Sequence, residues 1–115
     1  MKIPEWPRPD NQMSQLGRHH WSVSRLIELS RGLPVMEVSI DHISVDFIYD
    51  RLRLRELVMH MKAAQEADLN CPIILDEDGS VMDGRHRIMK AILNGHSTIK
   101  AVRFDENPSP CRVDG

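Results

Sequence analysis

The stretch DGRHRIMKA, residues 83–91, places three basic side chains at the predicted start of a helix. A helix N-terminus already carries about half a positive charge, so each exposed cation there costs roughly 0.3–1 kcal/mol. A bound anion would offset this cost, because glycine allows close backbone approach, the first N–H groups donate, and arginine adds a planar donor fork. The stretch therefore predicts a phosphate site. Its residues are Asp83, Gly84, Arg85, His86 and Arg87.

The same residues also have a purely structural interpretation. Asp83 could cap the helix and neutralise Arg85 and Arg87, which would leave the group as a solvated corner of the surface. The two alternatives differ in whether an anion binds, and the residues alone leave both open.

Apolar periodicity predicts the elements that precede this stretch. We expect a short helix within residues 22–34, a strand over 34–40 and a longer helix over 49–68. Two sets of side chains are predicted to face the core, one on the strand and one on the long helix: Met36, Val38 and Ile40, and Leu54, Leu57, Val58, Met61 and Ala64.

A hairpin leads into the stretch, and a helix and a strand follow it. Residues 71–84 predict two strands joined by an Asp-Glu-Asp-Gly turn. The next helix should end at Asn94-Gly95 and bury Ile88, Ala91 and Ile92, with a strand over 98–104. The order of elements predicts an α+β fold, in which helices pack on a small mixed β-sheet.

Length and composition predict one compact domain. The chain has 115 residues, of which 41% are hydrophobic and 28% charged. Closely spaced prolines predict an extended N-terminal arm over residues 1–13. The domain is expected over residues 14–106, and residues 107–115 have turn composition and are expected to fray as a C-terminal tail.

Charge and cysteine usage exclude several functional classes. With 15 Lys+Arg against 17 Asp+Glu, the net charge of −2 argues against a chain that coats nucleic acid or an anionic membrane. Cys71 and Cys111 are isolated, and no histidine pattern predicts a metal site of the chain's own. No apolar run approaches membrane-spanning length, and we expect a cytoplasmic protein that does not bind membranes.

Residues 72–104, PIILDEDGSVMDGRHRIMKAILNGHSTIKAVRF, resemble the core of the ParB/sulfiredoxin superfamily. In that superfamily a strand runs into a Gly-x-x-Arg or Gly-x-His-Arg turn, followed by a helix, a glycine and an outgoing strand. The likeness extends back to residue 34, covers about two thirds of the chain and implies a ParB/sulfiredoxin-like fold. The matching residues are Gly84, His86, Arg87, Ala91, Gly95 and the strand from Thr98.

The resemblance implies a nucleotide at this turn, because sulfiredoxins bind ATP there, free-serine kinases ADP and chromosome-partitioning proteins CTP. Mg²⁺ is expected to arrive with the phosphates, since it needs only one or two protein carboxylates. The phosphates are assigned by resemblance to Gly84, Arg85, His86 and Arg87. Two residues of the preceding helix are assigned further contacts, Arg53 and His60.

Departures from the superfamily discriminate between its branches. Sulfiredoxins have a cysteine immediately before the His-Arg pair, where this chain has Arg85, so sulfiredoxin activity is not expected. Partitioning proteins continue into a helix-turn-helix domain and a dimerisation domain, for which 115 residues are expected to leave no room. The closest motif is the DGHHR of free-serine kinases, whose aspartate is implicated in catalysis. This assigns a catalytic role to Asp83, with Glu37 as a candidate second carboxylate or an ordinary outward strand residue.

Three functional hypotheses follow. The leading one is a stand-alone ParB-like domain that binds a nucleoside di- or triphosphate, with phosphotransfer or nucleotide hydrolysis as its reaction. A rival is a DNA-associated module of a partition, plasmid or phage system, with nuclease activity in some relatives. A third is a non-catalytic regulatory module, and a homodimer is left open in each. The rival would use the arginines Arg51, Arg53, Arg55, Arg85 and Arg87 as one basic patch.

Overall fold

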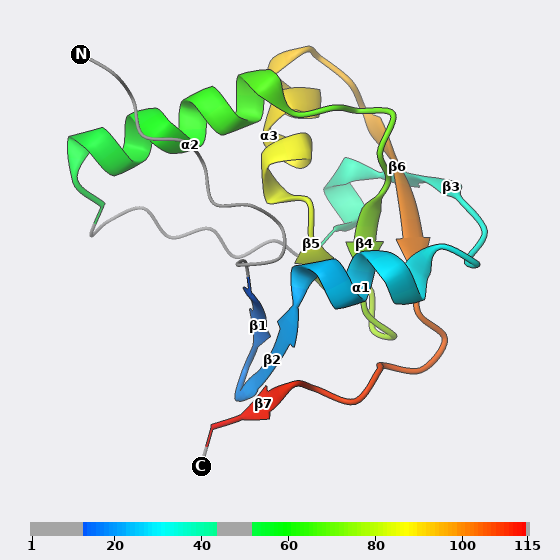
Figure 1. Cartoon of the computed structure of the whole chain (residues 1–115). Coiled ribbons are helices and arrows are strands. Elements are labelled where there is room, and N and C mark those ends of the chain that lie inside the picture. The colour runs from blue at the N-terminus through cyan, green and yellow to red at the C-terminus, as the bar shows by residue number, and fades with distance from the viewer. Residues whose placement is uncertain (1–12, 44–51, 115) are drawn as a thin grey trace.

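The computed structural model describes residues 13–43 and 52–114 (Figure 1). The predicted N-terminal arm, apart from Met13, lies outside the described residues, as does Arg51.

The main sheet has four strands and mixed directions. β3 (Met36–Ser39) pairs antiparallel with β6 (Thr98–Arg103), and β6 runs parallel to β4 (Ile73–Leu75). β4 pairs antiparallel with β5 (Val81–Asp83), which gives the order β3-β6-β4-β5. The predicted hairpin and both flanking strands are therefore present, and the prediction of an α+β fold with a mixed sheet is confirmed.

The hairpin turn between β4 and β5 is fixed by an aspartate and a glycine. Oδ1 of Asp76 accepts hydrogen bonds from the backbone N–H groups of Asp78 (2.9 Å) and Ser80 (2.7 Å). Gly79 has φ 86°, a conformation that glycine adopts without steric cost. This turn sets the register that delivers Asp83 to the start of the following helix.

A second sheet was not predicted. β1 (Met13–Leu16) pairs antiparallel with β2 (His19–Ser22), and β2 pairs with β7 (Arg112–Val113). Two of these strands have four residues and one has two, which is too short for alternation to stand out in the sequence.

The C-terminal tail is held by this second sheet. The Trp21 indole Nε1 donates to the Pro108 carbonyl at 2.9 Å, and the Asp114 N–H donates to the Arg18 carbonyl at 2.8 Å. The expectation that the tail frays is therefore wrong for residues 108–114. The tail's own sequence did not indicate these contacts, because the hydrogen-bond partners lie far away in the chain.

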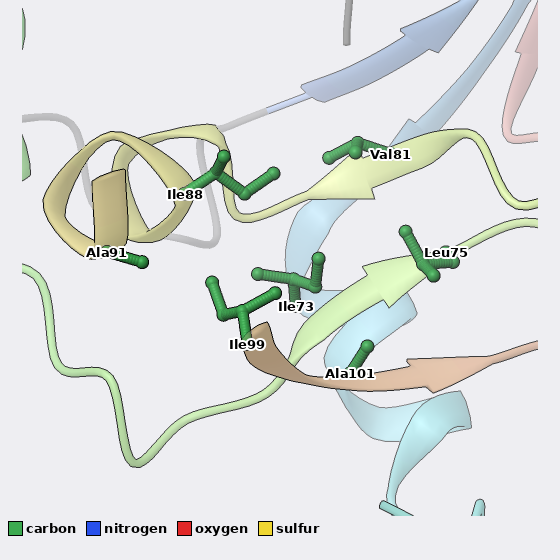
Figure 2. Packing of buried hydrophobic residues seen from close by; sticks show 7 residues of the cluster. All are labelled: Ile73, Leu75, Val81, Ile88, Ala91, Ile99 and Ala101. Atoms are coloured by element: carbon green, nitrogen blue, oxygen red, sulfur yellow. The ribbon is translucent and has the colours of Figure 1, made fainter. Parts of the chain in front are cut away.

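Both faces of the main sheet are covered. Neighbouring residues of β4 point to opposite faces: Ile73 joins a cluster under α3 (Arg85–Leu93), and Ile74 joins a cluster under α1 (Val23–Ser30). Figure 2 shows the first cluster, in which two residues of α3 meet side chains of the sheet. Its members are Ile73, Leu75, Val81, Ile88, Ala91, Ile99 and Ala101.

α2 (Leu54–Glu66) lies apart from this core and packs mainly on α3 (Figure 1). Of its predicted apolar stripe only Ala64 is buried, whereas Leu54 is 77% exposed and Met61 50% exposed. The prediction of a core-facing stripe is therefore wrong. Periodicity identified an amphipathic helix, but α2 has another helix as its neighbour and does not lie on the sheet.

Two further predicted core residues are exposed. Met36 begins an edge strand, and Ile92 lies on the side of α3 away from the sheet. Val38 and Ile40 do pack against the first cluster, Ile40 from a short 3₁₀ helix over Ile40–His42. The described helices are too short and too polar to cross a bilayer.

Candidate functional site

The turn before α3 requires glycine. Gly84 is the N-cap of the helix, with φ 114° and ψ 19°. A Cβ atom at this position would lie 2.4 Å from Cγ2 of Ile73 and 2.8 Å from its Cβ, which is closer than atoms approach. The backbone of the turn is thus pressed against β4, and no larger residue fits.

The N-terminus of α3 has no side-chain cap. No acidic residue lies in its first turn, and Asp83 does not accept a hydrogen bond from its backbone. The capping role that the structural interpretation gives to Asp83 is therefore wrong. The first N–H groups of a helix have no intrahelical acceptor, so this end remains a donor site for an anion.

Asp83 is instead paired with Arg87. The Arg87 guanidinium donates through Nη2 to Oδ2 of Asp83 at 3.3 Å and through Nη1 to the Pro72 carbonyl at 2.9 Å. Both side chains of the pair are about four fifths buried. Arg87 therefore ties the turn to the start of β4, and its charge is balanced by a carboxylate.

Arg85 is the cation of the turn whose charge is not balanced in this way. It lies in the first turn of α3 and borders the cavity described below. Within residues 13–43 and 52–114, Arg85 has no ion-pair partner. A positive side chain beside uncapped helix N–H groups concentrates positive potential at one point of the surface.

His86 and His60 link α3 to α2. Nε2 of His86 lies 2.9 Å from Nδ1 of His60, and the two rings stack with centroids 5.2 Å apart. Burial lowers the pKa of His86 below its ordinary value, and the neighbouring His60 lowers it further, while Asp83 acts in the opposite direction. Both effects favour the neutral form of His86.

A cavity of about 840 Å³ opens beside the turn. One wall is formed by residues 82–87, and a second by the later part of α2 and the segment that follows it, including Glu66, Asp68 and Cys71. The third wall comes from β1 and the first residue of α1. Pockets for small molecules have volumes of about 300–1,000 Å³, so this cavity is larger than a single phosphate needs.

Six of the eight residues proposed from the sequence line this one cavity. These residues are His60, Asp83, Gly84, Arg85, His86 and Arg87. Glu37 lies elsewhere, on β3 opposite Lys100, where it borders a separate cavity of about 250 Å³. Arg53 is the exposed N-cap residue of α2 and does not line the large cavity.

Ser14 also lines the large cavity and was not predicted from the sequence. Ser14 is 4% exposed, and its Oγ has no hydrogen-bond partner among the described residues. A lone serine in a four-residue strand carries no sequence signal, so only the fold brings it to the turn.

The carboxylates around the cavity are dispersed. Asp83 is paired with Arg87, and Asp68 accepts from the N–H of Asn70 at 2.9 Å. In the part of the chain that the structure describes, no group of three or more His, Cys, Asp or Glu side chains could hold a metal ion. The arrangement offers donors to an anion rather than ligands to a cation.

Comparison with known proteins adds no relative: no family model matches the chain, and a search of curated proteins finds no significant match.

Proposed function

We propose that this chain binds a nucleoside di- or triphosphate, with the phosphates at the N-terminus of α3. The observation that carries the proposal is the uncapped start of α3 beside Arg85, facing a cavity of about 840 Å³. Helix N–H groups and an arginine fork are the donors that phosphate oxygens accept from most strongly.

The turn holds its backbone donors in place. Gly84 packs directly against Ile73, since a Cβ there would collide with that side chain, and this close packing fixes the backbone at the start of α3. Arg87 adds a second tie, because its guanidinium donates to the Pro72 carbonyl and to Asp83. The N–H groups that would receive a phosphate are therefore held at the cavity wall.

The sequence resemblance supports the same ligand class. We propose that the chain is a ParB/sulfiredoxin-like domain, on the basis of its Gly-x-His-Arg-like turn between a strand and a helix. ATP, ADP and CTP are the candidate nucleotides, and Mg²⁺ would arrive with their phosphates. The proposal places the protein in the cytoplasm. DNA binding is not the preferred candidate, because Arg87 of the suggested basic patch is paired with Asp83.

Phosphotransfer or nucleotide hydrolysis is the reaction we propose for this site. Asp83 lies on the cavity wall and is oriented by Arg87. A carboxylate so placed can accept the proton of an attacking hydroxyl or position a metal ion. Glu37 borders the other cavity, so the proposal does not use it.

Isothermal titration with ATP, ADP, CTP and GTP in the presence of Mg²⁺ tests the binding. Arg85→Ala should lower the affinity for the tightest-binding nucleotide by about tenfold or more, because a charged hydrogen bond is lost. Arg53→Ala removes an exposed arginine away from the cavity and should leave the affinity unchanged. Absence of binding by every nucleotide, or equal losses in both variants, would refute the site.

A further inference from the structure

The hydrogen bond between His60 and His86 joins two ring nitrogens. Nδ1 of His60 lies 2.9 Å from Nε2 of His86, and the rings stack on each other. One of these two nitrogens must carry a hydrogen and the other must accept it, and the tautomers decide which ring donates. The bond therefore requires that a single proton lies between the rings.

This geometry sets the number of protons that the two rings can hold. In the neutral pair each ring has one N–H, and one of these lies between the rings. A further proton can bind at an outer nitrogen, which leaves the shared hydrogen bond intact and makes it charge-assisted. Yet another proton would place two N–H groups face to face and break the bond. The pair can thus hold one extra proton and remain joined.

Charged groups face His86 from three elements. They are His60 on α2, Asp83 on β5, and Arg85 and Arg87 on α3. The charges of Asp83 and Arg87 offset each other in their ion pair, whereas Arg85 and the helix N-terminus add positive potential. Burial lowers the pKa of His86 most, and both arginines lower it as well, so the empty site disfavours the extra proton. The other titratable side chains that border the cavity lie on its second wall: Glu66, Asp68 and Cys71.

Bound phosphates would reverse this balance. The proposed phosphate position is the first turn of α3, which contains His86, and both rings of the pair line the same cavity. Phosphate oxygens at this point oppose the charge of Arg85 and of the helix N-terminus. A nearby negative charge favours the protonated form of a histidine.

We propose that the His60–His86 pair takes up one proton from solvent when phosphates bind at the start of α3, and thereby supplies a positive charge only in the bound state. The inference rests on the proposed function and adds pH regulation to that site. No bond of the nucleotide changes, because the proton comes from the buffer and binds to a ring nitrogen. Nucleotide affinity therefore rises as the pH falls, by up to about tenfold for each pH unit over which one proton is taken up.

Nuclear magnetic resonance tests the proton uptake directly. The ring signals of His86, assigned by their loss in His86→Asn, are followed against pH with and without ATP or CTP and Mg²⁺. The midpoint of the His86 titration should move up by about one pH unit or more on binding. The signals of His96, an exposed residue that does not line the large cavity, should keep their midpoint.

The role of His60 as the partner ring is tested with His60→Phe. Phenylalanine keeps a ring on His86 but has no nitrogen to accept from it, so the charge-assisted hydrogen bond is lost. Isothermal titration at pH 8.5 should give nearly the wild-type affinity. At pH 6.5 the variant should bind about fivefold or more weakly than wild type, the effect of one charged hydrogen bond. The matched control, His96→Phe, should follow wild type at both pH values.

The comparison between variants cancels the titration of the nucleotide itself, because the ligand is the same in each. The inference alone is overturned if nucleotides bind but the His86 midpoint stays in place, or if His60→Phe shows the wild-type dependence of affinity on pH. If no nucleotide binds to wild type in the presence of Mg²⁺, the proposed function fails as well.

Discussion

The two sheets of this protein contribute to the same cavity but are held in different ways. The main sheet buries apolar side chains on both faces, and its strand β5 leads into the turn at the start of α3. The small sheet contributes Trp21 and Leu16 to the cluster under α1. Its edge strand β7 exposes Val113, and a 2.8 Å hydrogen bond joins His20 to Asp114 beside it. The comparison teaches that the start of α3 rests on apolar packing, whereas β7 is held by hydrogen bonds.

The largest expected difference comes from truncating one side chain in each sheet. Ile73→Ala removes a fully buried side chain of β4 and should lower the free energy of unfolding by about 4 kcal/mol. Val113→Ala truncates a half-exposed residue of β7 and should change it by less than about 0.5 kcal/mol. Urea denaturation measures both, and similar losses in the two variants would contradict the comparison.

The next effect is a test of how tightly the turn before α3 is fixed. Gly84→Ala combines a positive φ with a collision against Ile73 and should cost about 3 kcal/mol. Gly79→Ala has a positive φ but open space around it, so about 1 kcal/mol is expected. Equal unfolding free energies for the two variants would show that the backbone at Gly84 moves away from β4 at little cost.

A smaller effect concerns the acid sensitivity of the turn before α3. Because the pKa of His86 is lowered in the folded protein, the unfolded chain binds more protons as the pH falls below about 6.5, and stability decreases until the folded pKa is passed. His86→Asn should flatten the fall in stability between pH 7.5 and 5.5. His96→Asn, an exposed control, should retain it. The unfolding midpoint at each pH is the measurement.

The smallest effect is expected at the small sheet, at lower pH. The His20 hydrogen bond lowers the pKa of Asp114, so this contact contributes above the unfolded pKa of aspartate, near 4, and is lost as the pH falls through the folded value. Asp114→Asn should remove this part of the acid response without changing stability between pH 5.5 and 7.5. A shift in the higher pH range would mean that Asp114 also governs the histidines.

Elements that carry their own local signal could be predicted from the sequence. The hairpin over 71–84 carries its turn residues, Asp76 and Gly79, directly between the two strands. The helix α3 ends before Gly95 as predicted. The turn before α3 was identified for the same reason, since residues 83–87 are contiguous and their positive charges are disfavoured by the helix dipole.

Features that depend on distant partners could not be predicted. β2 pairs with β7 across about ninety residues of chain, and nothing in either short strand specifies the other. The stripe on α2 shows that periodicity reports amphipathicity but does not name the surface that a helix meets. Ser14 reached the cavity in the same way, through pairing that the sequence does not reveal.

The register of the β1–β2 hairpin gives the protein a built-in fluorescent probe. Trp21 stands directly opposite Ser14 in the β1–β2 ladder, and its indole is almost completely buried. The chain has one other tryptophan, Trp6, so Trp6→Phe leaves Trp21 on β2 as the single tryptophan. The emission maximum of Trp21 and its quenching by iodide would report separation of the β1–β2 hairpin from the main sheet. Circular dichroism would follow the helices in the same sample.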